Sequence, residues 1–207
     1  MTPEIENSAA RRVWSWHLWV PLTGAVVLIA AIFGFVVLRG DSGRPLHSQP
    51  TRSVTEVGFT ASQISNGKTI LAVGIRMRIP ENGVIAALAA GVHETRLQNL
   101  ADPAIPDSLA MPHDGVSTDH HALGVLAQGP SYASVSSRMN PSKAAENFYM
   151  HLLTVGDWQR CSPAAIAAMV QMSASPSGYA ADVPIAAEFY NRYVDDVTND
   201  VNKELTR

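Results

Sequence analysis

An uninterrupted apolar stretch near the N terminus constrains this 207-residue chain more than any other feature. Residues 17–38 read HLWVPLTGAVVLIAAIFGFVVL and contain no Asp, Glu, Lys or Arg. A helix of these 22 residues is long enough to cross a hydrocarbon core of about 30 Å. Trp14, Trp16 and Trp19 cluster at its start, as is typical of the aromatic belt at a membrane surface. The stretch therefore predicts a single transmembrane helix.

Two other kinds of segment contain apolar runs, and both fit this sequence less well. A cleaved signal peptide has an apolar core of about 7–15 residues before a small-x-small cleavage site, whereas this run is longer and ends at Val37-Leu38-Arg39. The unbroken hydrophobicity of this 22-residue run also disfavours a buried helix of a soluble protein. Arginines flank both ends and orient the run weakly, but the short tail of residues 1–16 favours a cytoplasmic N terminus. We expect an uncleaved signal-anchor in the cell membrane, with the C-terminal part outside the cytoplasm.

The rest of the chain divides into a linker and one domain. Residues 39–57 are rich in Ser, Thr, Pro, Gly and Arg without apolar periodicity, which indicates a linker. Residues 58–207 are numerous enough to bury a core without disulfides or metals. The single Cys excludes a disulfide framework, and 15 basic against 18 acidic residues provide no basic surface for nucleic acid.

Helical spacing of apolar residues dominates the predicted domain, while alternating strand patterns are scarce. The predicted fold class is therefore mainly α. Asn82 is a suitable N-cap for the second helix. Residues 101–138 are rich in Pro, Asp, Gly, Ser and His, and a connection of this length is usually functional or partly structured. The predicted helices cover residues 61–78, 82–97, 141–155, 163–172 and 184–197.

Glu94 is the residue best suited to acid chemistry. It follows the apolar segment VIAALAAGVH at the C-terminal end of the second predicted helix. The negative end of the helix dipole and desolvation by apolar neighbours both favour the neutral carboxyl, which is the form that a general acid needs. A surface glutamate beside Arg96 or His93 is the simpler interpretation, and His93 belongs to a different helix face, where packing is its expected role.

The order of several short motifs around Glu94 resembles a known arrangement. It is similar to the lysozyme-like domains of actinobacterial cell-wall proteins, which are relatives of the soluble lytic transglycosylases. The resemblance covers residues 64–194, and its order and spacing are more specific than any single motif. The motifs are HETRLQN (93–99), GVLAQGPS (124–131), NFYMHLL (147–153), GDWQ (156–159) and AAMVQMSASPSGYA (167–180).

The resemblance implies a lysozyme-like helical domain that cleaves the β-1,4 bond between N-acetylmuramic acid and N-acetylglucosamine in peptidoglycan glycan strands. In this family the glutamate matching Glu94 protonates the glycosidic oxygen, and the transition state is oxocarbenium-like. In transglycosylases it then acts as a base on the muramoyl 6-hydroxyl, which forms a 1,6-anhydro ring. The residues implied to bind the glycan are Thr95, Gln128, Gln171 and Tyr179, although ordinary packing explains Gln171 and Tyr179 equally well.

A muramidase would need a second carboxylate, about 5–10 Å from the first. The candidates all lie in the long connection: Asp102, Asp107, Asp114 and Asp119. The same connection also raises a metal site as an alternative, formed by His113, Asp114, Asp119, His120 and His121. Adjacent histidines are poorly spaced for zinc, so we expect no metal and no cofactor.

Several positions depart from the family pattern. Ala127 stands where the family has a Gln that lines the sugar groove, Gly129 replaces an Arg, and Tyr132-Ala133-Ser134 replaces Gly-Trp-Gly. Thr95 replaces a Ser and keeps the hydroxyl. These changes raise two alternatives to the enzyme. One is a catalytically degenerate wall-binding or scaffold protein, serving a cell-surface or DNA-transfer assembly, and the other is a membrane-anchored adaptor unrelated to glycans.

Overall fold

Helices make up most of the computed structural model, which describes residues 58–118, 121–173 and 176–207. The prediction of a mainly α domain is confirmed. These residues belong to one of the two units into which the chain divides, Gln49–Arg207. Within the described residues, no helix is long and apolar enough to cross a membrane. The predicted tail (1–16), membrane span (17–38) and linker (39–57) lie outside the described residues.

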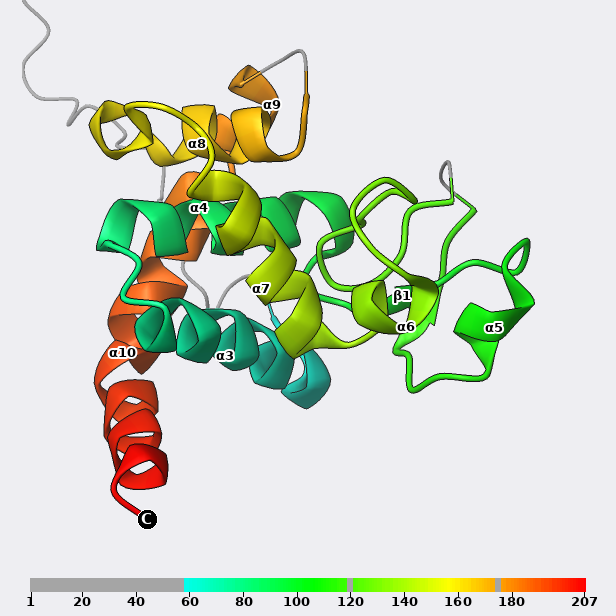
Figure 1. Cartoon of the computed structure of the whole chain (residues 1–207), viewed down its shortest axis with the longest axis horizontal. Helices are drawn as coiled ribbons and strands as arrows, with labels where there is room; N and C mark the ends of the chain where they lie inside the picture. Colours follow the sequence, from blue (N-terminus) through cyan, green and yellow to red (C-terminus); the bar gives the residue numbers. More distant parts are fainter. Residues whose placement is uncertain (1–57, 119–120, 174–175) are drawn as a thin grey trace, which may run out of the picture. The chain divides into compact units, whose positions relative to one another are not determined.

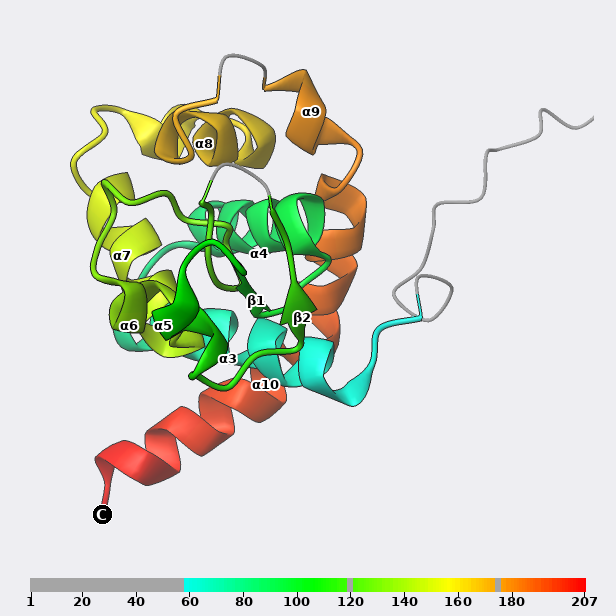
Figure 2. The same cartoon turned by 90° about the vertical axis from the view of Figure 1, so that its right-hand side faces the viewer.

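Helix α4 (Glu81–Thr95) is the centre of the fold. Each of its residues from 83 to 92 is buried, so it is apolar all round and needs cover on every side. Figures 1 and 2 show α8 (Pro163–Val170) above it and α3 (Ala61–Arg76) below it. The helices α7 (Pro141–Leu152) and α10 (Val183–Leu205) complete the cover and pack against the same core.

Local sequence explains where most of these helices begin. Thr60 and Gln63 form a capping box at the start of α3. The side chains of Asn140 and Ser162 accept N–H groups at the starts of α7 and α8, each of which has a Pro in its first turn. Asn82 is different, because it lies inside α4 after the N-cap residue Pro80, so the prediction of Asn82 as the N-cap is wrong.

The five predicted helices are all present, and one of them is longer than predicted. The prediction ended the last helix at Val197, but α10 continues to Leu205. Its buried residues Val197 and Val201 extend the apolar ridge by one more i, i+4 step. The polar residues around Val201 concealed that step, because they belong to the solvent face of the same helix.

The long connection after α4 folds into a small lobe of short elements. Strands β1 (Leu100–Ala101) and β2 (Gly115–Val116) pair in parallel, and α5 (Pro106–Leu109) lies in the chain segment that connects them. A tight turn at residues 123–128 and helix α6 (Val135–Arg138) complete the lobe, which lies beside one end of α4 and α7 in Figure 1. Of the two alternatives expected for this connection, functional or partly structured, the structure shows the second.

Candidate active site

Glu94 lies in the last turn of α4 and is half-buried. The hydroxyl of Tyr179 donates a hydrogen bond of 2.5 Å to its Oε1 atom. Tyr179 belongs to α9 (Ser177–Ala180), which is 85 residues away in sequence, and its side chain is almost fully buried. This contact fixes one carboxyl oxygen of Glu94 and leaves Oε2 without a hydrogen bond from the described residues.

The ring of Tyr179 packs against the ring of His93. The rings of His93 and Tyr179 lie 4.6 Å apart between centroids, tilted by 55°. His93 Nδ1 lies 2.8 Å from Oδ2 of Asp182. His93 therefore packs, as predicted, but it packs on the tyrosine that contacts Glu94. The orientation of Glu94 thus depends on a chain of contacts that runs through Tyr179 and His93 to Asp182.

Two phenols share the surroundings of Glu94. Burial and the negative charge of Glu94 raise the pKa of Tyr132 to about 12. Burial, the hydrogen bond to Glu94 and its charge also raise the pKa of Tyr179. Both hydroxyls consequently stay protonated at neutral pH and act as donors. The sequence did not single out Tyr132, because its only signal was a departure from the family motif.

Gln171 lies next to Tyr132 in the structure. The hydroxyl of Tyr132 donates to the carbonyl oxygen of Val170 and lies 3.3 Å from Oε1 of Gln171. Nε2 of Gln171 donates to the carbonyl of Leu126 at 2.7 Å. Gln171 therefore links Tyr132 to the turn at residues 123–128. Tyr132 and Gln171 form a second polar pair near Glu94, beside the Tyr179 contact.

Thr95 and Gln128 are buried, and their polar atoms bond to the protein itself. Thr95 Oγ1 donates to the carbonyls of Gly91 and Val125, at 3.1 and 2.8 Å. Gln128 is fully buried, and its Nε2 donates to the carbonyl of Ala144 at 2.8 Å. Both side chains thus hold the 123–128 turn in place, Thr95 through α4 and Gln128 through α7. Neither presents an exposed polar atom to a glycan.

The turn at residues 123–128 is closed by main-chain contacts and a buried arginine. Leu123 and Gln128 exchange backbone hydrogen bonds of 2.8 and 3.0 Å. Arg138 is 3% exposed, and its guanidinium donates to the carbonyls of Gln128, His121 and Ala133. Desolvation lowers its pKa. Arg138 gave no signal in the sequence, because all three of its acceptors are backbone atoms.

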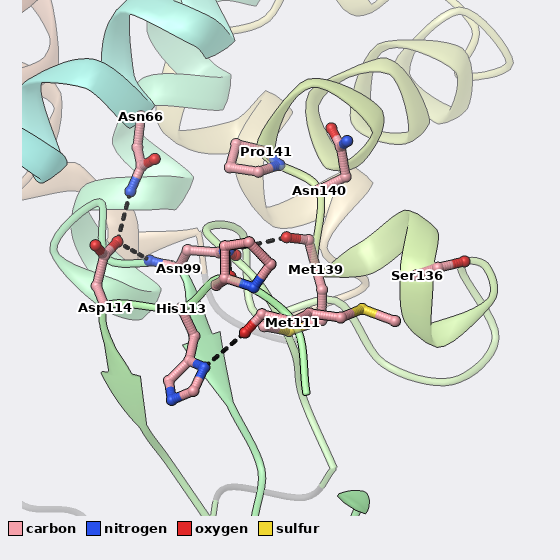
Figure 3. A pocket seen from close by; sticks show the side chains of 10 residues that line it. Asn66, Asn99, Met111, His113, Asp114, Ser136, Met139, Asn140 and Pro141 are labelled. Carbon is pink, nitrogen blue, oxygen red and sulfur yellow. Dashed lines mark hydrogen bonds between the residues drawn. The ribbon is translucent and has the colours of Figure 1, made fainter. Parts of the chain in front are cut away.

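The candidate second carboxylates are engaged elsewhere or exposed. Asp102 is buried, accepts the Ala104 N–H at 2.8 Å, and lies 3.0 Å from His121 Nδ1. Oδ2 of Asp114 accepts hydrogen bonds from Asn66 and Asn99 (Figure 3). Asp107 is exposed on α5. Asp119 lies outside the described residues.

The Asp102 contacts predict a pH dependence of stability. The Ala104 N–H, followed by His121, holds the pKa of Asp102 below its usual range, against the opposing effect of burial. A depressed folded-state pKa stabilises the fold above the unfolded-state pKa, and this stabilisation is lost as the pH falls. Asp102→Asn should therefore reduce the free energy of unfolding at pH 7, and the difference from the wild type should shrink below about pH 4. Urea denaturation at pH 7 and pH 3 measures both values, and a difference that stays constant would contradict this account.

The residues that the structure describes include no group of three or more His, Cys, Asp or Glu side chains that could hold a metal ion. His113 Nδ1 bonds to the carbonyl of Met111 at 2.8 Å, and His121 pairs with Asp102. His120 and Asp119, which belonged to the metal alternative, lie outside the described residues. The described histidines of the connection thus have structural contacts of their own.

Comparisons with known proteins assign this chain to no family. No protein-family model matches the sequence, and no curated protein is significantly similar to it. The functional interpretation therefore rests on the contacts around Glu94 and on the resemblance in motif order.

Proposed function

We propose that this chain is a membrane-anchored enzyme that cleaves peptidoglycan glycan strands, with Glu94 as its general acid and base. The observation that carries the proposal is the setting of Glu94. It is a half-buried carboxyl at the end of a buried apolar helix, with one oxygen bound by Tyr179. A carboxyl held in this way can exchange a proton with a substrate through its other oxygen.

The proposed reaction uses one carboxyl group twice. Glu94 gives its proton to the glycosidic oxygen while the bond from that oxygen to the muramic acid C1 breaks, and positive charge develops on the sugar ring. The glutamate, now a carboxylate, then removes the proton from the muramoyl 6-hydroxyl as O6 bonds to C1. The products are a 1,6-anhydro-muramoyl end and a free N-acetylglucosamine 4-hydroxyl, and no water is consumed.

The carboxylates of the lobe favour this single-carboxylate route over a muramidase. Both oxygens of Asp102 are bound, one by the Ala104 N–H and one by His121. One oxygen of Asp114 accepts from Asn66 and Asn99, and this side chain lines a pocket that does not include Glu94. A hydrolase would need a carboxylate beside Glu94 that is free to act as a nucleophile or to activate water. We therefore place the chain with the lytic transglycosylases in mechanism.

The location follows from the same proposal. Residues 17–38 would anchor the chain in the cell membrane, with residues 39–57 as a tether and the helical domain on the outer side. Glycan strands lie outside the membrane, so the anchor keeps the domain next to its substrate. No cofactor is required, because proton transfer by Glu94 is the only chemistry invoked.

A second candidate is a wall-binding or scaffold protein that has lost activity. The burial of Thr95 and Gln128 favours it, since neither side chain exposes a polar atom to hold a sugar. Ala127 and Gly129 also lack side-chain hydrogen-bonding groups. Digestion of purified wall sacculi by the full chain, with mass analysis of the soluble fragments, separates the two candidates. The enzyme releases fragments, and the binding protein only cosediments.

Replacement of Tyr179 by Phe should lower the rate of cleavage without unfolding the protein. The variant keeps the ring on His93 and removes only the hydroxyl that fixes Glu94. Loss of a hydrogen bond to a charged group should lower kcat by about tenfold to a hundredfold, with little change in KM. Initial rates of sacculus solubilisation measure this effect. Tyr190→Phe on α10 is the matched control and should retain wild-type rates, and equal rates for both variants would remove Tyr179 from the mechanism.

A further inference from the structure

A pocket of about 380 Å³ lies between the small lobe and the starts of α3 and α7, and Glu94 is not part of it. Figure 3 shows side chains of α3, of residues 111–114 and of the start of α7 around this pocket. Its volume is within the range of sites that bind small molecules or single side chains. None of its residues has a role in the proposed cleavage reaction.

One wall of the pocket presents acceptors in fixed positions. Oδ2 of Asp114 accepts hydrogen bonds of 2.8 Å from Nδ2 of Asn66 and from the Asn99 N–H. Nδ2 of Asn66 also donates to the carbonyl of Leu97 at 2.8 Å. These contacts orient both side chains and leave Oδ1 of Asp114 and Oδ1 of Asn66 without donors among the described residues. Asp114 also forms no ion pair within that part of the chain.

The other walls combine an unused donor with apolar surface. Oδ1 of Asn140 accepts N–H groups at the start of α7, which leaves its Nδ2 without an acceptor in the described residues. Met111, Pro112, Met139 and Pro141 supply the apolar surface of the pocket. The pocket thus offers one negative charge and a carbonyl acceptor, an amide donor, and an apolar wall suited to a methylene chain.

We propose that this pocket binds a primary ammonium group on a short aliphatic stem, as in a lysine-type side chain of a peptide. The ammonium donates to Oδ1 of Asp114 in a charge-assisted hydrogen bond, and Oδ1 of Asn66 offers a separate acceptor on the other side of the Asn66–Asp114 contact. The methylene stem packs on Met111 and Met139. A carbonyl of the peptide accepts from Nδ2 of Asn140. This binding does not require cleavage activity, so it stands or falls separately from the proposed function.

The test uses a probe with a single amine, measured by ligand-observed NMR on the full chain in detergent at pH 7.5. Nα-acetyl-lysine amide should bind, and its Nε-acetylated form should bind at least about tenfold more weakly. Butylamine shows whether the bound amine belongs to a peptide or is a free amine. Weaker binding of butylamine than of Nα-acetyl-lysine amide assigns the site to peptides, and equal binding assigns it to free amines. Equal binding of the two lysine probes, or no binding by folded protein, would overturn the proposal.

Two variants connect the binding to the pocket. Asp114→Asn keeps an oxygen for Asn66 and Asn99 but removes the charge, so affinity for the lysine probe should fall at least about tenfold. Asn140→Asp keeps the N-cap of α7 but replaces the amide donor with a second carboxylate, so affinity for butylamine, which has no carbonyl, should rise several-fold. A merely structural role of these residues predicts no rise. Unchanged affinity in both variants, with wild-type far-UV spectra, would place the amine elsewhere.

Discussion

Replacement of Glu94 by Gln should lower the rate of glycan cleavage by about 10²- to 10⁴-fold, the usual contribution of a general acid. Gln retains the Oε1 acceptor for the Tyr179 hydroxyl, so the contacts around the site are preserved. It has no proton that it can transfer to a glycosidic oxygen. The measurement is the rate at which purified sacculi are solubilised, followed by turbidity.

The control is Glu81→Gln, at the opposite end of the same helix. Glu81 is exposed in the first turn of α4, so its neutralisation changes the net charge equally without touching the site. The control should retain the wild-type rate. Equal rates for the Glu94 and Glu81 variants would show that cleavage does not depend on Glu94.

Replacement of Gly124 by Ala should be the most destabilising single change in the lobe. Gly124 has φ of +81°, a conformation that residues with a Cβ rarely adopt. An added Cβ would lie 1.9 Å from the carbonyl oxygen of Arg138, which cannot move without disrupting α6. We expect a loss of about 3 kcal/mol or more in the free energy of unfolding. Urea denaturation followed by far-UV circular dichroism measures this loss.

Gly129 provides the matched control for this prediction. It lies five residues further along, and a Cβ there would meet no atom within 4 Å. Gly129→Ala should change the free energy of unfolding by no more than about 0.5 kcal/mol. Similar stabilities for the two alanine variants would mean that the 123–128 turn is not closed as described.

The helices of the domain were predictable because their apolar residues recur with helical spacing. The apolar run of α4 is too short to span a membrane, so its lack of a polar face indicates a helix buried at the centre of the domain. The lobe was not predictable in detail. Its two strands have two residues each, and it is held by side chains such as Arg138 and Asn99 that bond to distant backbone carbonyls. Such partners leave no periodic pattern in the sequence.

The candidate site was predictable only in part. Motif order indicated Glu94 and Tyr179, and the structure joins them directly. The inward direction of Thr95 and Gln128 depends on how the 123–128 turn docks onto α4 and α7, which residue spacing does not specify. His93 belongs to a different face of α4 from Glu94, yet one tyrosine ring from α9 contacts both residues.

The mass of the fragments that the full chain releases from purified peptidoglycan sacculi tests the proposed mechanism most directly. A single-carboxylate mechanism predicts fragments that end in 1,6-anhydro-muramic acid, and none from the Glu94→Gln variant. Fragments with reducing muramic acid ends would contradict the single-carboxylate mechanism. A folded protein that binds sacculi and releases no fragments would contradict the enzyme itself and establish the wall-binding alternative.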